Sequence, residues 1–559
     1  MNGTLNITGE AKTTEGINSF PGGATDQGAN ANSRYSGYVF TGDGDVNIKG
    51  VSDSGNGLAI RRFDNTGLTG NFTITGESNS GNGVAVPEFG NVSLVNATIT
   101  GNSNTGTGIL MNAGDEHIKK IDLNGNTLTG TSVSGAGIKI NGNNVSIANG
   151  SLNGTSQGNG AGVELTGGNN YTVSHATVTG QSAGGNAVGV NGNLTLNDST
   201  LSGNTVNGSG VSVNGNVNAT NTTISGGATG SGNGVSLGGN ASITDGTVTG
   251  SAVDGNGVSV SGNVNTTNTT VTGDATGSGT GVDLAGNVTG GTVNGSSADG
   301  TGVNVSGDST LTDVTVNGNT TSGTGVDVNA NLTSQGSTTV NGNATGTGSG
   351  VDLAGNVTGG TVNGNATDGT GVNVSGNSTL TDVTVNGNTT SGTGVDVNAN
   401  LTNQGSTTVN GNATGSGTGV DLAGNVTGGT MNGSSTDGTG VNVSGNSTLT
   451  DVTVNGNTTS GTGVDISGNL TNQGNTTITG NSGSGAGVGL NGTVTGGSLV
   501  GNSVSGPGLY VTGNSTLNGV DVTDSSQSGP GTQKESAELR RQVYERQQQL
   551  SRSDTVRDA

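Results

Sequence analysis

Short runs of alternating apolar and polar residues, each ended by glycine and asparagine, recur along most of this chain. Val372 and Val374 alternate with polar residues, and so do Val383 and Val385 in the next run. Period-two alternation that is rich in valine and threonine and bounded by turn residues predicts strands. A helix would need apolar residues three or four positions apart and would be weakened by the 116 glycines. The pattern therefore predicts an all-β chain.

The strand pattern repeats about every 23 residues, at intervals of 21 to 25 between successive apolar anchors that follow a glycine-rich turn. These anchors are Val163, Val188, Val211, Val235, Val258, Val282, Val303, Val326, Val351, Val372, Val395, Val420, Val441, Val464, Val488 and Leu509. A longer period of 69 residues is also present, since residues 303–371 and 372–440 differ at only seven positions. Such self-similarity is typical of a solenoid. We predict a right-handed parallel β-helix of roughly 20 coils, with three strands in each coil.

The repeat divides the chain into three predicted regions. Residues 1–129 read as divergent N-terminal coils or a cap, and they hold all five phenylalanines. Residues 130–523 read as regular coils, with the 69-residue super-repeat in 303–464. Residues 524–559 read as a linker and a short C-terminal α-helix, because Thr532 and Glu535 form a capping-box pattern ahead of a helical run that ends near Leu550. The first residues lack the features of a signal peptide, so we expect the distal part of a larger precursor or a truncated gene.

The distribution of charged residues excludes several classes of ligand. No lysine or arginine lies between Lys139 and Lys534, whereas residues 140–533 hold 20 acidic groups. Such a surface repels nucleic acid and phosphate groups. It also lacks the cationic groups that enzymes acting on acidic polysaccharides need. We therefore expect a non-enzymatic protein that binds no nucleic acid. Because no run of 18 apolar residues occurs, we expect no transmembrane helix.

Aspartate occupies the position between two anchors in consecutive coils, as Asp327 then Asp352 and again as Asp396 then Asp421. Stacked coils would bring each pair within about 5 Å. Two adjacent carboxylates repel each other unless a cation or solvent screens them. The pairs are therefore candidate calcium sites, and calcium is the one cofactor that the sequence suggests; the alternative is a solvent-screened pair.

A charged insertion lengthens one coil to 29 residues and predicts a loop that projects from the surface. A surface loop can carry binding, and the alternative is a solvated charge cluster. Its candidate binding residues are Asp115, Glu116, His117, Lys119 and Lys120. The other histidine, His175, sits in a strand-like position and is expected on the surface of a coil rather than in a catalytic role.

The recurrent Gly-Asn-x-Thr-Leu, Thr-Val-x-Gly-Asn and Gly-x-Gly-Val-x-Val runs resemble the repeats of large bacterial exoproteins. These are the filamentous-haemagglutinin-like proteins of two-partner secretion and the passengers of autotransporter adhesins. The resemblance covers about residues 38–523. It implies export through an outer-membrane transporter, a secreted or cell-surface location, and attachment to a host-cell or bacterial receptor or to further copies of the protein. The given sequence contains no Asn-Pro-Asn motif of the secretion domain, and its few aromatic residues lead us to expect no translocator barrel within it.

Two other classes of function remain open. A β-helical lyase or hydrolase of polysaccharides would need carboxylates beside lysine or arginine on one face. An ice-binding solenoid would need Thr-x-Thr aligned at one phase over many coils. The pairs Thr320-Thr321 and Thr338-Thr339 recur but do not supply that alignment.

Overall fold

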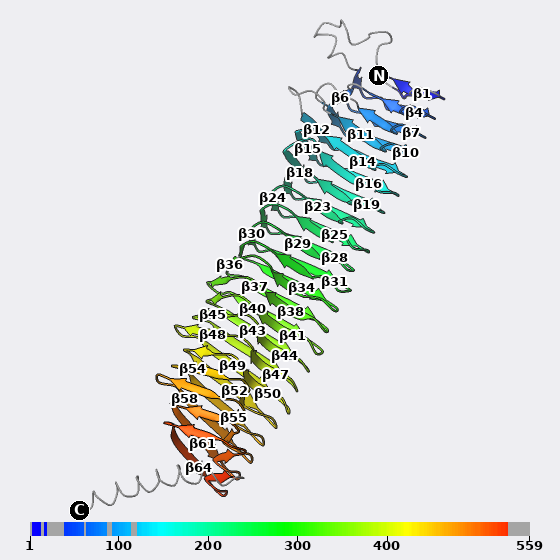
Figure 1. The fold of residues 1–559 in the computed structure, drawn as a ribbon. Coiled ribbons are helices and arrows are strands. Elements are labelled where there is room, and N and C mark those ends of the chain that lie inside the picture. The colour runs from blue at the N-terminus through cyan, green and yellow to red at the C-terminus, as the bar shows by residue number, and fades with distance from the viewer. Residues whose placement is uncertain are drawn as a thin grey trace, which may run out of the picture. The chain divides into compact units, whose positions relative to one another are not determined.

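Three short strands, one in each of three parallel sheets, make up every turn of this all-β chain. The computed structural model describes residues 3–12, 16–18, 38–60, 63–86, 92–112 and 120–534. These residues form a parallel β-solenoid of about 21 turns and contain no helix. Contacts divide the chain into unit 1, Met1–Gly300, and unit 2, Thr301–Ala559. Within each unit the strands stack as ladders (Figure 1).

Unit 1 contains strands of all three sheets. Sheet A holds β1 (Leu5–Ala11), β4 (Val46–Ser52), β7 (Phe72–Ser78), β10 (Ala97–Ser103), β13 (Thr127–Ser132), β16 (Ser151–Ser156), β19 (Thr177–Ser182), β22 (Thr200–Thr205), β25 (Thr223–Ala228), β28 (Thr247–Ala252), β31 (Thr270–Ala275) and β34 (Thr292–Ser297). Sheet B holds β2 (Ile17–Asn18), β5 (Leu58–Ala59), β8 (Val84–Val86), β11 (Ile109–Asn112), β14 (Ile138–Asn141), β17 (Val163–Thr166), β20 (Val188–Val190), β23 (Val211–Val213), β26 (Val235–Leu237), β29 (Val258–Val260) and β32 (Val282–Leu284). Sheet C holds β3 (Tyr38–Gly42), β6 (Phe63–Leu68), β9 (Val92–Val95), β12 (Lys120–Asn124), β15 (Asn144–Ala148), β18 (Asn170–Ser174), β21 (Asn193–Asn197), β24 (Val217–Thr220), β27 (Ala241–Thr244), β30 (Val264–Thr267) and β33 (Val288–Thr289).

Unit 2 is built in the same way. Sheet A holds β37 (Thr315–Thr320), β40 (Thr339–Ala344), β43 (Thr361–Ala366), β46 (Thr384–Thr389), β49 (Thr408–Ala413), β52 (Thr430–Ser435), β55 (Thr453–Thr458), β58 (Thr477–Ser482), β61 (Ser498–Ser503) and β64 (Asp521–Ser526). Sheet B holds β35 (Val303–Val305), β38 (Thr324–Val328), β41 (Ser349–Leu353), β44 (Thr370–Val374), β47 (Thr393–Val397), β50 (Thr418–Leu422), β53 (Val441–Val443), β56 (Val464–Ile466), β59 (Val488–Leu490), β62 (Leu509–Val511) and β65 (Thr532–Lys534). Sheet C holds β36 (Ser309–Thr312), β39 (Leu332–Gln335), β42 (Val357–Thr358), β45 (Ser378–Thr381), β48 (Leu401–Gln404), β51 (Val426–Thr427), β54 (Ser447–Thr450), β57 (Leu470–Gln473), β60 (Thr493–Thr495) and β63 (Thr516–Asn518).

The predicted anchors form the core of each unit. All sixteen lie in sheet B, and none has more than 1% of its surface exposed. Parallel pairing aligns successive anchors, as Val372 with Val395 between β44 and β47. Burial of one valine or leucine side chain contributes about 1.5–3 kcal/mol. The prediction of parallel coils with one strand in each face is confirmed.

Glycine fills a column where sheets A and B approach most closely. In β46 this residue is Gly387, and a Cβ atom there would lie 1.9 Å from the carbonyl oxygen of Gly394. The column persists through Gly501 of β61, whose register partner in β64 is Asp524. The corner therefore has no room for a side chain, which explains why glycine occupies this register position in every sheet A strand up to β61.

Asparagine side chains form a continuous ladder on the outward face of sheet A in unit 2. From Asn341 onward, each amide nitrogen donates to the amide oxygen of the preceding turn over 2.9 Å. The members are Asn317, Asn341, Asn363, Asn386, Asn410, Asn432 and Asn455. Such a ladder satisfies amides that would otherwise be half-buried without partners, and it fixes the register of adjacent turns.

An alanine in place of Asn386 should destabilise the turns around β46. The change removes the donor to Asn363 and the acceptor of Asn410, at a cost of about 1–2 kcal/mol. Hydrogen exchange of the amides in β43, β46 and β49 measures this loss. Thr384→Ala, on the same face of β46, is the matched control, and equal effects of both changes would contradict the role of the ladder.

The described residues do not support the predicted C-terminal helix, and its predicted start is a strand. Thr532–Lys534 forms strand β65, which pairs with β62 through Leu509 and Thr532. These residues lie at the phase of sheet B, so pairing with the open edge of β62 satisfies their backbone groups. The remainder of the predicted helix lies outside the described residues.

Candidate functional site

The predicted aspartate pairs lie side by side on the outward face of sheet B in unit 2. Asp327 of β38 is the register partner of Asp352 in β41, and Asp396 of β47 is the partner of Asp421 in β50. Each aspartate stands between two buried aliphatic residues, which forces its side chain outward. The register thus places each pair of carboxylates on neighbouring strands.

Burial dominates the electrostatics of these carboxyl groups. Burial raises the pKa of Asp327, a hydrogen bond from Asn329 opposes the rise, and the charge of Asp352 adds to it. The same three causes act on the pKa of Asp396, through Asn398 and Asp421.

Further carboxyls show the same effect. Burial raises the pKa of Asp421, against hydrogen bonds from Ser444, Asn442 and the backbone of Leu422. Burial alone raises the pKa of Asp465 in β56. The outward face of sheet B therefore carries a line of carboxyls that take up protons more readily than free aspartate.

The pairs differ in how their oxygens are satisfied. The Oδ1 atom of Asp352 accepts a hydrogen bond from Ser375 over 2.6 Å. The Oδ1 atom of Asp421 accepts from Asn442 and Ser444, each over 3.1 Å. Asp396 Oδ2 accepts from Asn398 over 2.9 Å, whereas its Oδ1 atom is buried without a hydrogen-bond partner. Among the oxygens of these pairs, Asp396 Oδ1 would therefore gain the most stabilisation from a bound proton or cation.

The fit of the pairs to calcium is limited by the number of ligands. Calcium takes six to eight oxygen ligands, usually with several carboxylates. In the described ranges no group of three or more histidine, cysteine, aspartate or glutamate side chains is placed to hold a metal ion. A calcium ion on one pair would therefore complete its shell mainly with amide oxygens and water, which predicts weak binding.

Calcium should raise the melting temperature of the chain only slightly, and only through these pairs. Thermal melts in calcium and in chelator measure the effect, and Asp396→Asn tests whether the Asp396–Asp421 pair carries it. Asp382→Asn is the control, because the Oδ1 atom of Asp382 accepts from the backbone of Ser406 in a turn. Identical midpoints in calcium and chelator would remove the calcium hypothesis.

The predicted binding loop lies almost entirely outside the described residues. Asp115, Glu116, His117 and Lys119 belong to the undescribed segment 113–119. The backbone of Lys120 begins strand β12 and pairs with Asn144 of β15.

His175 occupies a turn rather than a strand. It follows β18 and has a φ of 49°, in a column of turn residues with similar values. Asparagine and aspartate tolerate this left-handed conformation best, and they fill the other positions in unit 1: Asn96, Asn149, Asp198, Asn221, Asp245 and Asn268. His175 Nε2 lies 3.3 Å from Asp198 Oδ2 in an exposed pair. This arrangement gives His175 a place in the turn column, and exposed pairs of this kind contribute little stability.

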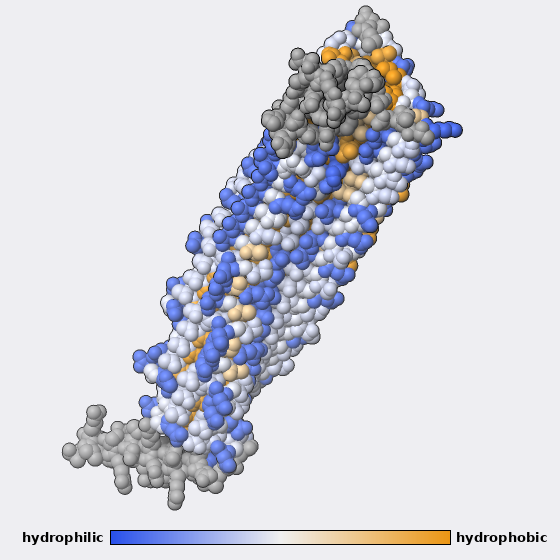
Figure 2. Space-filling model, turned by 45° about the horizontal axis from the view of Figure 1, so that its top comes forward, coloured by the Kyte–Doolittle hydropathy of each residue, from blue (hydrophilic) through white to orange (hydrophobic). Residues whose placement is uncertain are grey.

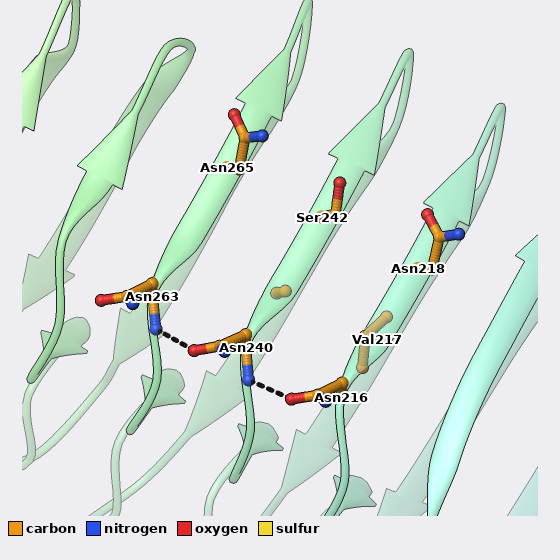
Figure 3. Close-up of a pocket in the computed structure, with 8 residues that line it drawn as sticks. Asn216, Val217, Asn218, Asn240, Ser242, Asn263 and Asn265 are labelled. Atoms are coloured by element: carbon orange, nitrogen blue, oxygen red, sulfur yellow. Dashed lines mark hydrogen bonds between the residues drawn. The ribbon is translucent and has the colours of Figure 1, made fainter. Parts of the chain in front are cut away.

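Sequence reasoning missed a shallow groove of about 370 Å³ on sheet C of unit 1. Val217 and Ala241 lie beneath the groove, each with only 2% of its surface exposed. Asn218, Ser242 and Asn265 stand along one side on neighbouring strands (Figure 3). Within the described structure these three side chains make no hydrogen bond to protein. The only sequence signal was a polar residue in the same place of successive coils, which many coils share.

The other side of the groove is fixed by the backbone. Asn216 Oδ1 accepts from the backbone nitrogen of Asn240 over 2.9 Å, and Asn240 Oδ1 accepts likewise from Asn263 (Figure 3). The amide oxygens on this side are thus engaged. The groove is thus lined by neutral donors and acceptors, which suits an uncharged ligand.

One face of the described surface is mainly polar. In the face shown in Figure 2, blue and near-white residues dominate the described part, and orange residues occur in small areas. No helix in the described ranges is long and apolar enough to cross a membrane. Comparison with models of known families, and with characterised proteins, finds no match to this chain.

Proposed function

We propose that this chain is a non-catalytic repeat segment of a secreted or cell-surface bacterial adhesin. The observation that carries the proposal is the repetition of one polar, neutral surface from turn to turn, as in the seven-member asparagine ladder of unit 2. Weak contacts repeated along such a surface add up through multivalency, because each later contact forms within an assembly that already exists.

The ligand is expected to be neutral at the described outward faces. From residue 140 to residue 533 the chain has 20 acidic groups and no lysine or arginine, so an anionic receptor would be repelled there. The sheet C groove, with Asn218, Ser242 and Asn265 free to bond, is the place where we expect a neutral receptor or glycan to dock. A polysaccharide-active enzyme is disfavoured because this stretch supplies no cationic group to polarise an acidic substrate.

Attachment and self-association are two forms of the same activity, and one experiment separates them. Beads coated with the chain should cluster with each other, adhere to host cells or bind unrelated bacteria more than beads that carry another acidic protein at equal density. Asn218→Asp with Asn265→Asp adds charge to the groove and should weaken receptor binding, whereas Asn386→Asp tests the sheet A face. Coated beads that neither cluster nor adhere would contradict the proposal.

Export is proposed to require an outer-membrane transporter, as the resemblance to two-partner exoproteins implies. Co-expression of the chain, joined to a two-partner secretion domain, with the transporter that recognises this domain tests the route. Surface exposure should depend on the transporter, and exposure without it would contradict this route.

A further inference from the structure

The strand register aligns threonines that lie far apart in the sequence on the outward face of sheet A in unit 1. Between β7 and β34 the strands pair in register, as Thr98 with Thr73 and Thr127 with Thr98. Two parallel rows result, which we call the threonine face. The first row is Thr73, Thr98, Thr127, Ser151, Thr177, Thr200, Thr223, Thr247, Thr270 and Thr292. The second row is Thr75, Thr100, Thr129, Asn153, Thr179, Ser202, Ser225, Thr249, Thr272 and Asn294.

This alignment supplies the Thr-x-Thr array that the sequence did not show at one phase. Thr-x-Thr occurs in β7, β10, β13, β19, β28 and β31. The other strands between β7 and β34 carry serine or asparagine at one or both positions. The insertions that separate these strands in sequence lie in turns, so they do not disturb the rows.

The threonine hydroxyl groups of the face point away from the core. In the described part of the chain, none of the threonine side chains in these two rows makes a hydrogen bond to protein. Within the second row, Ser225 donates to Ser202 over 3.1 Å. In unit 2 the second row is instead the asparagine ladder, whose amides bond to each other. The threonine face therefore offers free hydroxyls where the corresponding face of unit 2 offers bonded amides.

The geometry of the face is periodic in two directions. Adjacent strands lie about 4.8 Å apart, and alternate residues of one strand lie about 6.6 Å apart. Threonine is β-branched, so its side chain has few rotamers and its hydroxyl and methyl groups keep fixed directions. A regular net of hydroxyls and methyls on a rigid sheet holds water in an ordered pattern without a further loss of side-chain entropy.

The lack of charge in the two rows indicates which kind of ligand the threonine face can bind. Neither row contains a charged residue, although the chain carries a net charge of −23. Glu77 and Asp274 stand at the next outward position of β7 and β31, so the two rows form a neutral strip beside scattered carboxylates. A neutral surface with two-dimensional periodicity complements a neutral, periodic partner. We propose that the threonine face of unit 1 binds ice, by matching an ordered layer of water to the ice surface.

Adsorption of the full chain to ice tests this proposal. The chain should enter a slowly growing ice hemisphere and inhibit ice recrystallisation, and both effects should be lost in the double variant Thr179→Tyr with Thr249→Tyr. Tyrosine favours strands but breaks the flat surface, and circular dichroism verifies that the variant keeps its fold. The matched control is the same double change on the outward face of sheet C, Thr172→Tyr with Thr220→Tyr, which should keep ice binding.

Three results would overturn the proposal. The unmodified chain could adsorb to ice no better than an unrelated acidic protein at equal concentration, a result that does not depend on any variant folding. The control variant could lose ice binding as fully as the threonine variant. The threonine variant could keep it. None of these outcomes bears on the bead assay for adhesion, so the two proposals fail independently.

Discussion

Replacing Gly387 with valine should unfold the turn that contains it and loosen the turns on either side. A Cβ atom at this position would lie 1.9 Å from the carbonyl oxygen of Gly394 and 2.6 Å from its carbonyl carbon. Both obstacles are backbone atoms, so no rotamer change relieves the clash and sheets A and B must separate. We expect a loss of about 3 kcal/mol or more in the local free energy of unfolding.

Limited proteolysis and hydrogen exchange measure this loss. Trypsin is uninformative, because no lysine or arginine lies between Lys139 and Lys534, so thermolysin is the appropriate enzyme. Cleavage should appear near β43, β46 and β49, since each repeat of a solenoid contacts only its neighbours. Asn388→Val, on the outward face of the same strand, is the control and should stay resistant.

A second column of glycines, in which Gly394 directly precedes the anchor Val395, offers an internal comparison. Its members precede the anchors, and one of them is naturally an alanine, Ala187, whose side chain is fully buried. Gly394→Ala should therefore cost less than Gly387→Ala. Equal losses would show that the crowding at Gly387 is not what requires glycine.

Acidification should stabilise unit 2 through the carboxyls of sheet B. The pKa values of Asp327, Asp396, Asp421 and Asp465 are raised above the ordinary value of 3.8, mainly by burial. The folded state therefore binds these protons more readily than the unfolded state. The stabilising contribution is complete near and below the unfolded pKa of 3.8, and it is lost as the pH rises through the higher folded pKa values.

Neutralising these carboxyls should raise stability at neutral pH and flatten the pH dependence. We expect Asp327→Asn with Asp396→Asn to raise the melting temperature at pH 7 by about 2–4 °C, because partial exposure screens the carboxyls and limits the gain to roughly 1 kcal/mol. The difference in melting temperature between the variant and the unmodified chain should shrink as the pH falls toward 4. Asp382→Asn is the control. A variant that melts lower at pH 7, with a difference that grows on acidification, would contradict this account.

The strands and the core were predictable because each depends on a few local residues. Val372 and Val374 alternate with polar neighbours, and this alternation alone specifies which side chains are buried. Glycine and asparagine between the runs specify the turns. The close pairing of Asp327 with Asp352 followed from equal phase in adjacent coils.

Features that depend on several distant residues were not predictable. The threonine face joins residues separated by 22 to 29 positions, and its continuity depends on turns of unequal length that absorb the difference. The buried, unpartnered Oδ1 atom of Asp396 depends on how the side chains around it pack. At Thr532 a local capping pattern favoured a helix, but the open edge of β62 provides tertiary pairing that outweighs it.

The central claim is that turns of about 23 residues stack in exact parallel register and so build continuous rows of side chains. The chain has no cysteine, so engineered pairs report the register directly. Asn386→Cys with Asn410→Cys should form a disulfide readily under mild oxidation, because register partners in adjacent strands lie about 5 Å apart and disulfides span about 4.4–6.8 Å between Cα atoms. Asn386→Cys with Asn412→Cys, shifted by two residues to about 8 Å, should stay reduced. Preferential oxidation of the shifted pair, or equal oxidation of both, would contradict the stacking.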